Sequence, residues 1–150
     1  MMDTGAKPLI IPVFITGQGC PQRCVFCCGR VTAGPAEEVT PGLIEEKARK
    51  YGAGKGRAAQ LAFYGGNFTG LPPAEQERLL DCARALAERG LVSSVRVSTR
   101  PDYMTEEIAR FLQARRVAAV ELGAESLLDS VLEASRRGHT AAQVADAVRA

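Results

Sequence analysis

Short apolar segments alternate with helix-like segments along the chain, and this alternation constrains the fold more than any other feature. Four short apolar or alternating runs are each followed by a segment with helical spacing of apolar residues. The runs expected to form strands are residues 9–15, 60–64, 95–98 and 117–122. Strands that alternate with helices pair in parallel, because right-handed crossovers carry the chain back across the sheet. The sequence therefore predicts an α/β fold with one parallel sheet.

Capping residues mark where the helices begin. Thr40 is a candidate N-cap with Pro41 at the first helical position, and Thr105 precedes two glutamates suited to the positive end of a helix dipole. Thr140 and Gln143 have the spacing of a capping box. We expect the other helices over residues 72–89 and 127–135.

Length and composition narrow the class of protein. The chain has 150 residues, which suits a single domain, and its net charge of +2 neither supports nor excludes nucleic-acid binding. Asp3 interrupts the start and the first apolar run is short, so no signal peptide and no membrane span are predicted. Five cysteines, an odd number with three clustered, favour a reducing compartment over a disulfide framework. We therefore expect a cytoplasmic protein without a membrane partner.

The clustered cysteines carry the strongest chemical signal. Cys20, Cys24 and Cys27 lie within eight residues, and three thiolates can hold three irons of a [4Fe–4S] cluster. The fourth iron would then have no protein ligand nearby in sequence, which leaves a position open for chemistry. Cys28 follows directly and is interpreted as a spare thiol, with exchange as a cluster ligand as the alternative.

Two simpler interpretations of this motif stay open beside the iron–sulfur one. The spacing also fits one buried helix face, but glycines and Pro21 in the segment disfavour a helix. Zinc usually requires a second Cys or His pair further along the chain. Cys82 stands alone in a helical pattern and His139 is the only histidine, so the sequence favours iron–sulfur. We interpret Cys82 as packed on an apolar helix face and His139 as a turn residue.

The polar and glycine-rich sequences all follow the expected strands. The cysteines follow the first strand, and residues 65–67, 99–103 and 121–126 lie at the ends of the other three. Parallel α/β folds bind ligands at the carboxyl ends of their strands. Arg100 is well placed there to bind a carboxylate. We expect all four loops to contribute to one site.

The chain resembles the radical S-adenosylmethionine enzymes through its Cys-x3-Cys-x2-Cys loop. Residues 63–72, 98–103, 121–126 and 137–140 resemble the branch that contains the catalytic subunit of Elongator and bacterial proteins named after oxygen-independent coproporphyrinogen oxidase. The resemblance runs from Ile10 to the last residue. It implies a partial (β/α) barrel of parallel strands, with about four of an expected six βα units present. It also implies that residues 1–150 form the N-terminal part of the core domain, to be completed by further sequence or a partner chain.

The resemblance also implies cofactors, an activity and a partner. Cys20, Cys24 and Cys27 would ligate a [4Fe–4S] cluster, and S-adenosyl-L-methionine would chelate its open iron. One-electron reduction would cleave S-adenosylmethionine to a 5′-deoxyadenosyl radical that abstracts hydrogen from an unidentified substrate. The electron would come from a donor such as flavodoxin or ferredoxin. The alternative function is a non-catalytic iron–sulfur, metal-binding or electron-transfer module.

The resemblance further assigns residues to S-adenosylmethionine, though no catalytic side chain. Gly65 and Gly66 would allow close backbone approach to the methionine amino group, because glycine has no Cβ. Asn67 and Glu125 stand where the family usually has glutamate and glutamine. The complete set of candidate contacts is Gly65, Gly66, Asn67, Ser98, Thr99, Arg100, Glu125 and Ser126.

Overall fold

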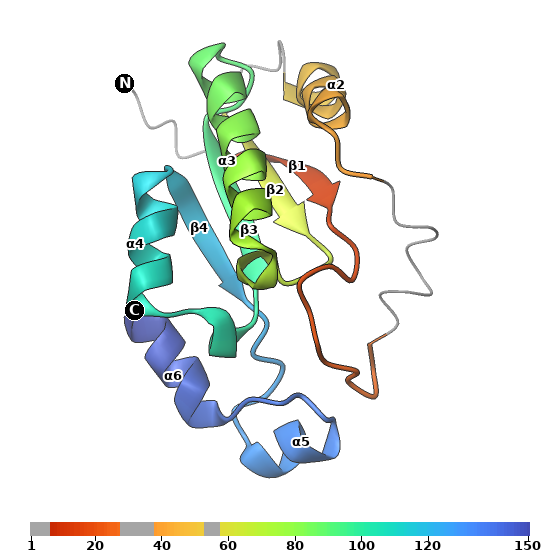
Figure 1. Cartoon of the computed structure of the whole chain (residues 1–150), viewed down its shortest axis with the longest axis vertical. Helices are drawn as coiled ribbons and strands as arrows, with labels where there is room; N and C mark the ends of the chain where they lie inside the picture. Colours follow the sequence, from red (N-terminus) through yellow and green to blue (C-terminus); the bar gives the residue numbers. More distant parts are fainter. Residues whose placement is uncertain (1–6, 28–37, 53–57) are drawn as a thin grey trace.

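A single parallel sheet forms the frame of the molecule (Figure 1). The structure is a computed structural model that describes residues 7–27, 38–52 and 58–150. Within them the strands are β1 (Leu9–Phe14), β2 (Ala59–Tyr64), β3 (Ser94–Thr99) and β4 (Val117–Leu122), paired in the order β1-β2-β3-β4. All three pairings are parallel. The predicted α/β class and parallel sheet are confirmed, and the strand limits agree within one residue.

The helices begin where the capping residues predicted. They are α2 (Pro41–Gly52), α3 (Pro73–Glu88), α4 (Glu106–Ala114), α5 (Asp129–Ala134) and α6 (Ala141–Arg149), with short 3-10 turns η1 (Phe68–Gly70) and η2 (Pro101–Tyr103). The Thr40 and Thr105 hydroxyls each accept a hydrogen bond from a backbone amide three residues on, at 3.2 Å. Thr140 and Gln143 form the predicted capping box.

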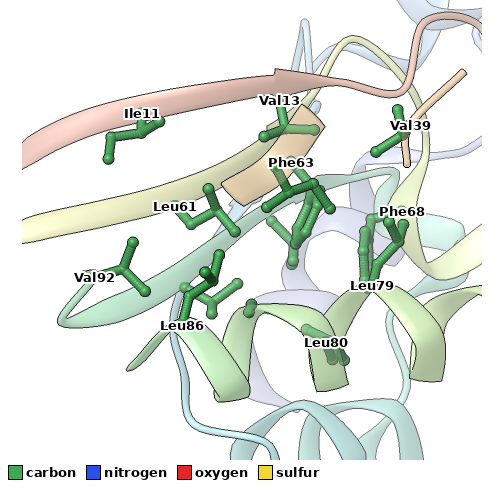
Figure 2. Close-up of a cluster of buried hydrophobic side chains, with 14 of the residues drawn as sticks. Ile11, Val13, Val39, Leu61, Phe63, Phe68, Leu79, Leu80, Leu86 and Val92 are labelled. Carbon is green, nitrogen blue, oxygen red and sulfur yellow. The ribbon is translucent and has the colours of Figure 1, made fainter. Parts of the chain in front are cut away.

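The hydrophobic core lies between the sheet and α3 (Figure 2). Leu61 and Phe63 of β2 are fully buried, and the Phe63 ring lies 5.3 Å from that of Phe68. The apolar face of α3 supplies Leu79, Leu80, Ala83 and Leu86. Each such side chain contributes about 1.5–3 kcal/mol when removed from water. This packing fixes the strands whose ends carry the predicted site, and Cys82 packs at the edge of the same core, as predicted.

The sheet becomes less buried from β2 toward β4. Five of the six residues of β2 are buried, whereas none of the six residues of β4 is. Polar side chains join these strands: Arg96 Nε donates to Gln60 Oε1 at 2.8 Å, and Tyr64 Oη donates to Glu121 Oε1 at 2.9 Å. The part of the chain that the structure describes contains no helix long and apolar enough to cross a membrane.

Candidate functional site

A cavity of about 180 Å³ lies at the carboxyl ends of the strands. The loops after all four strands line it, together with the turn between α5 and α6, which Figure 1 shows beyond the strand ends. The predicted convergence of four loops is therefore present in the structure. The lining residues are Gly17, Cys20, Gln22, Cys27, Gly65, Gly66, Asn67, Ser98, Thr99, Arg100, Gly123, Glu125 and Arg137.

The cysteine loop leaves β1 and runs along the cavity without forming a helix. Cys20 and Cys27 line the cavity, and Cys24 is buried with 7% exposure beside them. None of the three is in a disulfide. The alternative of three core cysteines on one buried helix face is wrong, because residues 20–27 are not helical and Cys27 is exposed. Cys28 lies outside the described residues.

The loop after β2 holds the cysteine loop in place. A Cβ on Gly66 would lie 2.5 Å from the Ile15 carbonyl oxygen and 2.7 Å from that of Gln18, so only glycine fits against this backbone. Gly65 lies beside it with a φ of +80° and also lines the cavity. Gly66 therefore has a packing role that the sequence did not indicate, in addition to its place on the cavity wall.

Asn67 connects three of the four loops through its buried amide. Its side-chain nitrogen donates to the Gly19 carbonyl oxygen at 2.8 Å. Its oxygen accepts from the Thr99 hydroxyl at 2.6 Å and from the Arg100 backbone amide at 3.1 Å. With 1% exposure, Asn67 positions the neighbouring candidate residues as well as lining the cavity.

Arg100 brings a buried positive charge to the cavity. One guanidinium nitrogen donates to Asp102 Oδ2 at 2.9 Å, while Nε and Nη1 have no hydrogen-bond partner among the described residues. Burial lowers the pKa of Arg100, but the hydrogen bond and charge of Asp102, and then the nearby thiols Cys20 and Cys24, raise it above its usual value. The unpartnered nitrogens give this side chain the capacity to bind a carboxylate.

The remaining predicted contacts, Ser98, Glu125 and Ser126, differ in whether they line the cavity. Glu125 lines the cavity with a left-handed backbone (φ 63°), and Ser98 of β3 lines it as well. Ser126 is not among the lining residues, and its hydroxyl accepts a hydrogen bond from the Leu128 backbone amide at 3.1 Å. The structure thus brings together every predicted S-adenosylmethionine contact except Ser126.

Four lining residues were not among the predicted contacts or cluster ligands: Gly17, Gln22, Gly123 and Arg137. Arg137 Nη1 donates to Cys24 Sγ at 3.4 Å, and Nη2 donates to the Gly123 carbonyl oxygen. The only sequence signal for Arg137 is its place in the segment 137–140 that carries the resemblance.

His139 is a buried residue of the turn before α6, where a turn residue was predicted, and it is not among the residues that line this cavity. Its Nε2 is 3.2 Å from the Ala124 carbonyl oxygen, and Nδ1 is 3.9 Å from Asp102 Oδ1. Burial lowers the pKa of His139, and the charges of Arg137 and Arg100 lower it further, against the raising effects of Ala124 and Asp102. The imidazole is therefore neutral at pH 7.

The donor set around the cavity fits the cofactors that the sequence predicted. Three thiols belong to one loop, two of them on the cavity wall, and a [4Fe–4S] cluster takes each thiolate on a different iron. The unpartnered nitrogens of Arg100 suit an anionic group such as an amino-acid carboxylate. Among the described residues, no three His, Cys, Asp or Glu side chains converge to hold a single metal ion.

Comparisons with known proteins agree with this architecture. The family model of the radical SAM superfamily matches residues 14–150. An uncharacterized methyltransferase of Pyrococcus horikoshii is 28% identical over 142 residues, which cover 91% of this chain and 29% of that protein. The structure of an N-terminally deleted archaeal Elp3 from Methanocaldococcus infernus is similar, with a TM-score of 0.59 and 19% identity. That match covers 93% of this chain and 34% of the Elp3 chain, so this chain spans about a third of either relative.

Proposed function

The chain belongs to the radical SAM superfamily, and on this premise we propose that it supports reductive cleavage of S-adenosylmethionine at a [4Fe–4S] cluster. The observation that carries the proposal is the meeting of four strand-end loops at one cavity, with cysteine thiols on one wall and a partly unpartnered arginine on another. When bound, the cluster supplies the electron that cleaves S-adenosylmethionine to methionine and a 5′-deoxyadenosyl radical, which abstracts hydrogen from a substrate.

The chain's own residues bind and orient the cofactors. Cys20, Cys24 and Cys27 would hold the cluster. Nε and Nη1 of Arg100, which have no partner among the described residues, would bind the methionine carboxylate. Asp102 holds the other side of the Arg100 guanidinium, so its direction is fixed before a ligand arrives. Glu125, which lines the cavity, would accept hydrogen bonds from ribose hydroxyls.

The electron donor and the source of the substrate pocket are also part of this proposal. A flavodoxin or ferredoxin would supply the electron, as the resemblance to the radical S-adenosylmethionine enzymes implies. The remaining βα units of the family's partial barrel would supply the rest of the substrate pocket. The likeness to Elp3 supports the fold and leaves the substrate to experiment.

Anaerobic reconstitution tests the proposal. With iron and sulfide, the protein should bind iron and show a broad visible iron–sulfur absorbance, and with dithionite and S-adenosylmethionine it should form 5′-deoxyadenosine, measured by mass spectrometry. The C20A, C24A and C27A variants should lose both signals. Cys82→Ala is the matched control, because Cys82 packs in α3 against the core and should leave both signals unchanged. A wild-type protein with neither absorbance nor 5′-deoxyadenosine contradicts the proposal.

The same experiment separates the enzyme from a non-catalytic iron–sulfur module. A module would take up the cluster and be indifferent to S-adenosylmethionine. Alanine substitution of Gly66 cannot decide between them, because its Cβ would meet the backbone of the cysteine loop. Arg100→Gln is the more informative variant. If the protein is an enzyme, this variant should keep the cluster absorbance and lose 5′-deoxyadenosine formation. If it is a non-catalytic module, the variant and the wild type should show the same absorbance and neither should form 5′-deoxyadenosine.

A further inference from the structure

Arg137 contacts a predicted cluster ligand from the far end of the described chain. Its Nη1 donates to Cys24 Sγ at 3.4 Å across 113 residues of sequence. We propose that Arg137 is a positioning residue that holds the Cys24 thiolate and raises the reduction potential of the cluster. This inference rests on the proposed function, because it requires that Cys24 ligate a [4Fe–4S] cluster.

The backbone around Arg137 fixes where its side chain can reach. The Arg137 amide donates to the Leu132 carbonyl oxygen at 2.8 Å, and Arg136 before it has a left-handed φ of 56°. Thr140, the N-cap of α6, follows three residues later. From this turn the Arg137 side chain reaches Cys24 of the cysteine loop, and the residue is 8% exposed. The guanidinium is further held by donation from Nη2 to the Gly123 carbonyl oxygen.

The charge of Arg137 is less neutralised than that of Arg100. Arg100 pairs with Asp102 at 2.9 Å, and both side chains are largely buried. Among the described residues, the carboxylate within ion-pair distance of Arg137 is that of Glu125, at 3.8 Å, and its side chain is 47% exposed, so water screens the pair. Arg137 also makes the side-chain hydrogen bond to a cysteine sulfur, which Arg100 does not make within the described residues. Arg137 therefore presents both a donor and a net positive charge to Cys24.

A donor and a positive charge at a ligand sulfur favour the reduced cluster. Reduction adds one negative charge that the cluster and its thiolates share, and hydrogen bonds to the sulfurs and nearby charge set the potential. Because Arg137 is buried, solvent and salt screen its charge little. Since the proposed reaction begins with reduction of the cluster, Arg137 would make that step easier for a biological electron donor.

The potential of the reconstituted cluster tests this inference without S-adenosylmethionine or turnover. In Arg137→Gln the equilibrium constant for reduction should fall about tenfold, which is about 59 mV toward more negative potential for one electron. Arg136→Gln is the matched control, because Arg136 is the adjacent arginine, is exposed and lines a separate hollow beside α5 and α6. The reduction potential of the cluster in Arg136→Gln should equal that in the wild type, as measured by a redox titration followed by electron paramagnetic resonance.

A second variant covers a failure of cluster assembly. Arg137→Lys keeps the charge with a single ammonium in place of the fork, so its potential should lie between those of the wild type and Arg137→Gln. If Arg137→Gln assembles no cluster, Arg137→Lys alone decides: a potential below that of the wild type supports the inference, and an unchanged potential overturns it. If the wild type and both Arg137 variants hold clusters with equal reduction potentials, this inference is overturned and the proposed function still stands. A wild type that holds no cluster overturns both.

Discussion

At the scale of single residues, Asn67 does most to hold the site together. Its amide joins the cysteine loop through Gly19, and the end of β3 through Thr99 and Arg100. The sequence marked Asn67 as a ligand contact because it stands where the family has an acidic residue. Its three internal hydrogen bonds give it a structural role as well, and that role can be measured without any cofactor.

We expect Asn67→Ala to lower the free energy of unfolding by about 2–4 kcal/mol, since each buried group left without a partner costs about 1–3 kcal/mol. Urea unfolding followed by circular dichroism measures the change. Gln113→Ala, an amide at an exposed position of α4, should shift stability by no more than about 0.5 kcal/mol. Equal effects of the two substitutions would contradict the role assigned to Asn67.

His139 gives the protein a component of acid sensitivity. Its pKa in the folded chain is lowered from 6.5, chiefly by burial and also by Arg137 and Arg100, against the effect of Asp102. The unfolded chain therefore takes up a proton at a higher pH than the folded chain. Stability from this group is complete above pH 6.5 and is lost as the pH falls below 6.5 toward the folded pKa.

We expect His139→Gln to lose less stability than the wild type between pH 8 and pH 5. The urea midpoint of each protein at both pH values gives this difference, and titrating carboxylates contribute equally to the two proteins. Identical losses in wild type and variant would show that His139 is not held neutral by the fold.

At the scale of elements, the close approach of two loops explains why the glycine after β2 cannot be replaced. Gly66 lies against the backbone of the cysteine loop, where a Cβ would be 2.5 Å from the Ile15 carbonyl oxygen. Gly42, in the first turn of α2, has only the Thr40 hydroxyl within 4 Å of such an atom, at 3.9 Å. The two positions therefore predict opposite responses to the same substitution.

We expect Gly66→Ala to destabilise the protein by about 1–3 kcal/mol through overpacking. Gly42→Ala should stabilise it by about 0.5–1 kcal/mol, because alanine has the higher helix propensity and meets no obstruction there. Thermal unfolding of both variants measures the pair. A neutral Gly66→Ala would mean that the two loops lie further apart than the structure places them.

At the scale of the whole molecule, the parallel sheet, its helices and most of the residues that line the cavity could be predicted from the sequence. Strand periodicity, capping threonines and polar strand ends predicted the sheet and placed Cys20, Arg100 and Glu125 at one edge, because those signals are local. The contact between Arg137 and Cys24 could not be predicted, since no local pattern specifies where a long side chain ends 113 residues away. The hydrogen bond that engages the Ser126 hydroxyl depends on loop geometry in the same way.

Ligand binding should appear as a property of the whole fold. For the cluster-loaded protein, S-adenosylmethionine at 100 times its Kd should add about 2.7 kcal/mol of stability and raise the Tm. Arg100→Gln should show a much smaller rise than the wild type. Arg110→Gln, on the exposed surface of α4, should show the full rise. Equal shifts in all three proteins would exclude Arg100 from the binding site.

Because burial differs across the sheet, we expect the strands that carry the cavity walls to open at different rates. β2 is paired on both sides and almost wholly buried, so its amide protons should exchange with solvent only in rare, near-global openings. Those of β4, where no residue is buried, exchange through smaller and more frequent fluctuations. We therefore expect the strand that carries Gly123 and Glu125 at its end to open more often than the strand that carries Gly65 and Asn67. A ligand bound between these two strand ends would therefore leave the cavity through openings at the end of β4, while its contacts at the end of β2 persist longer.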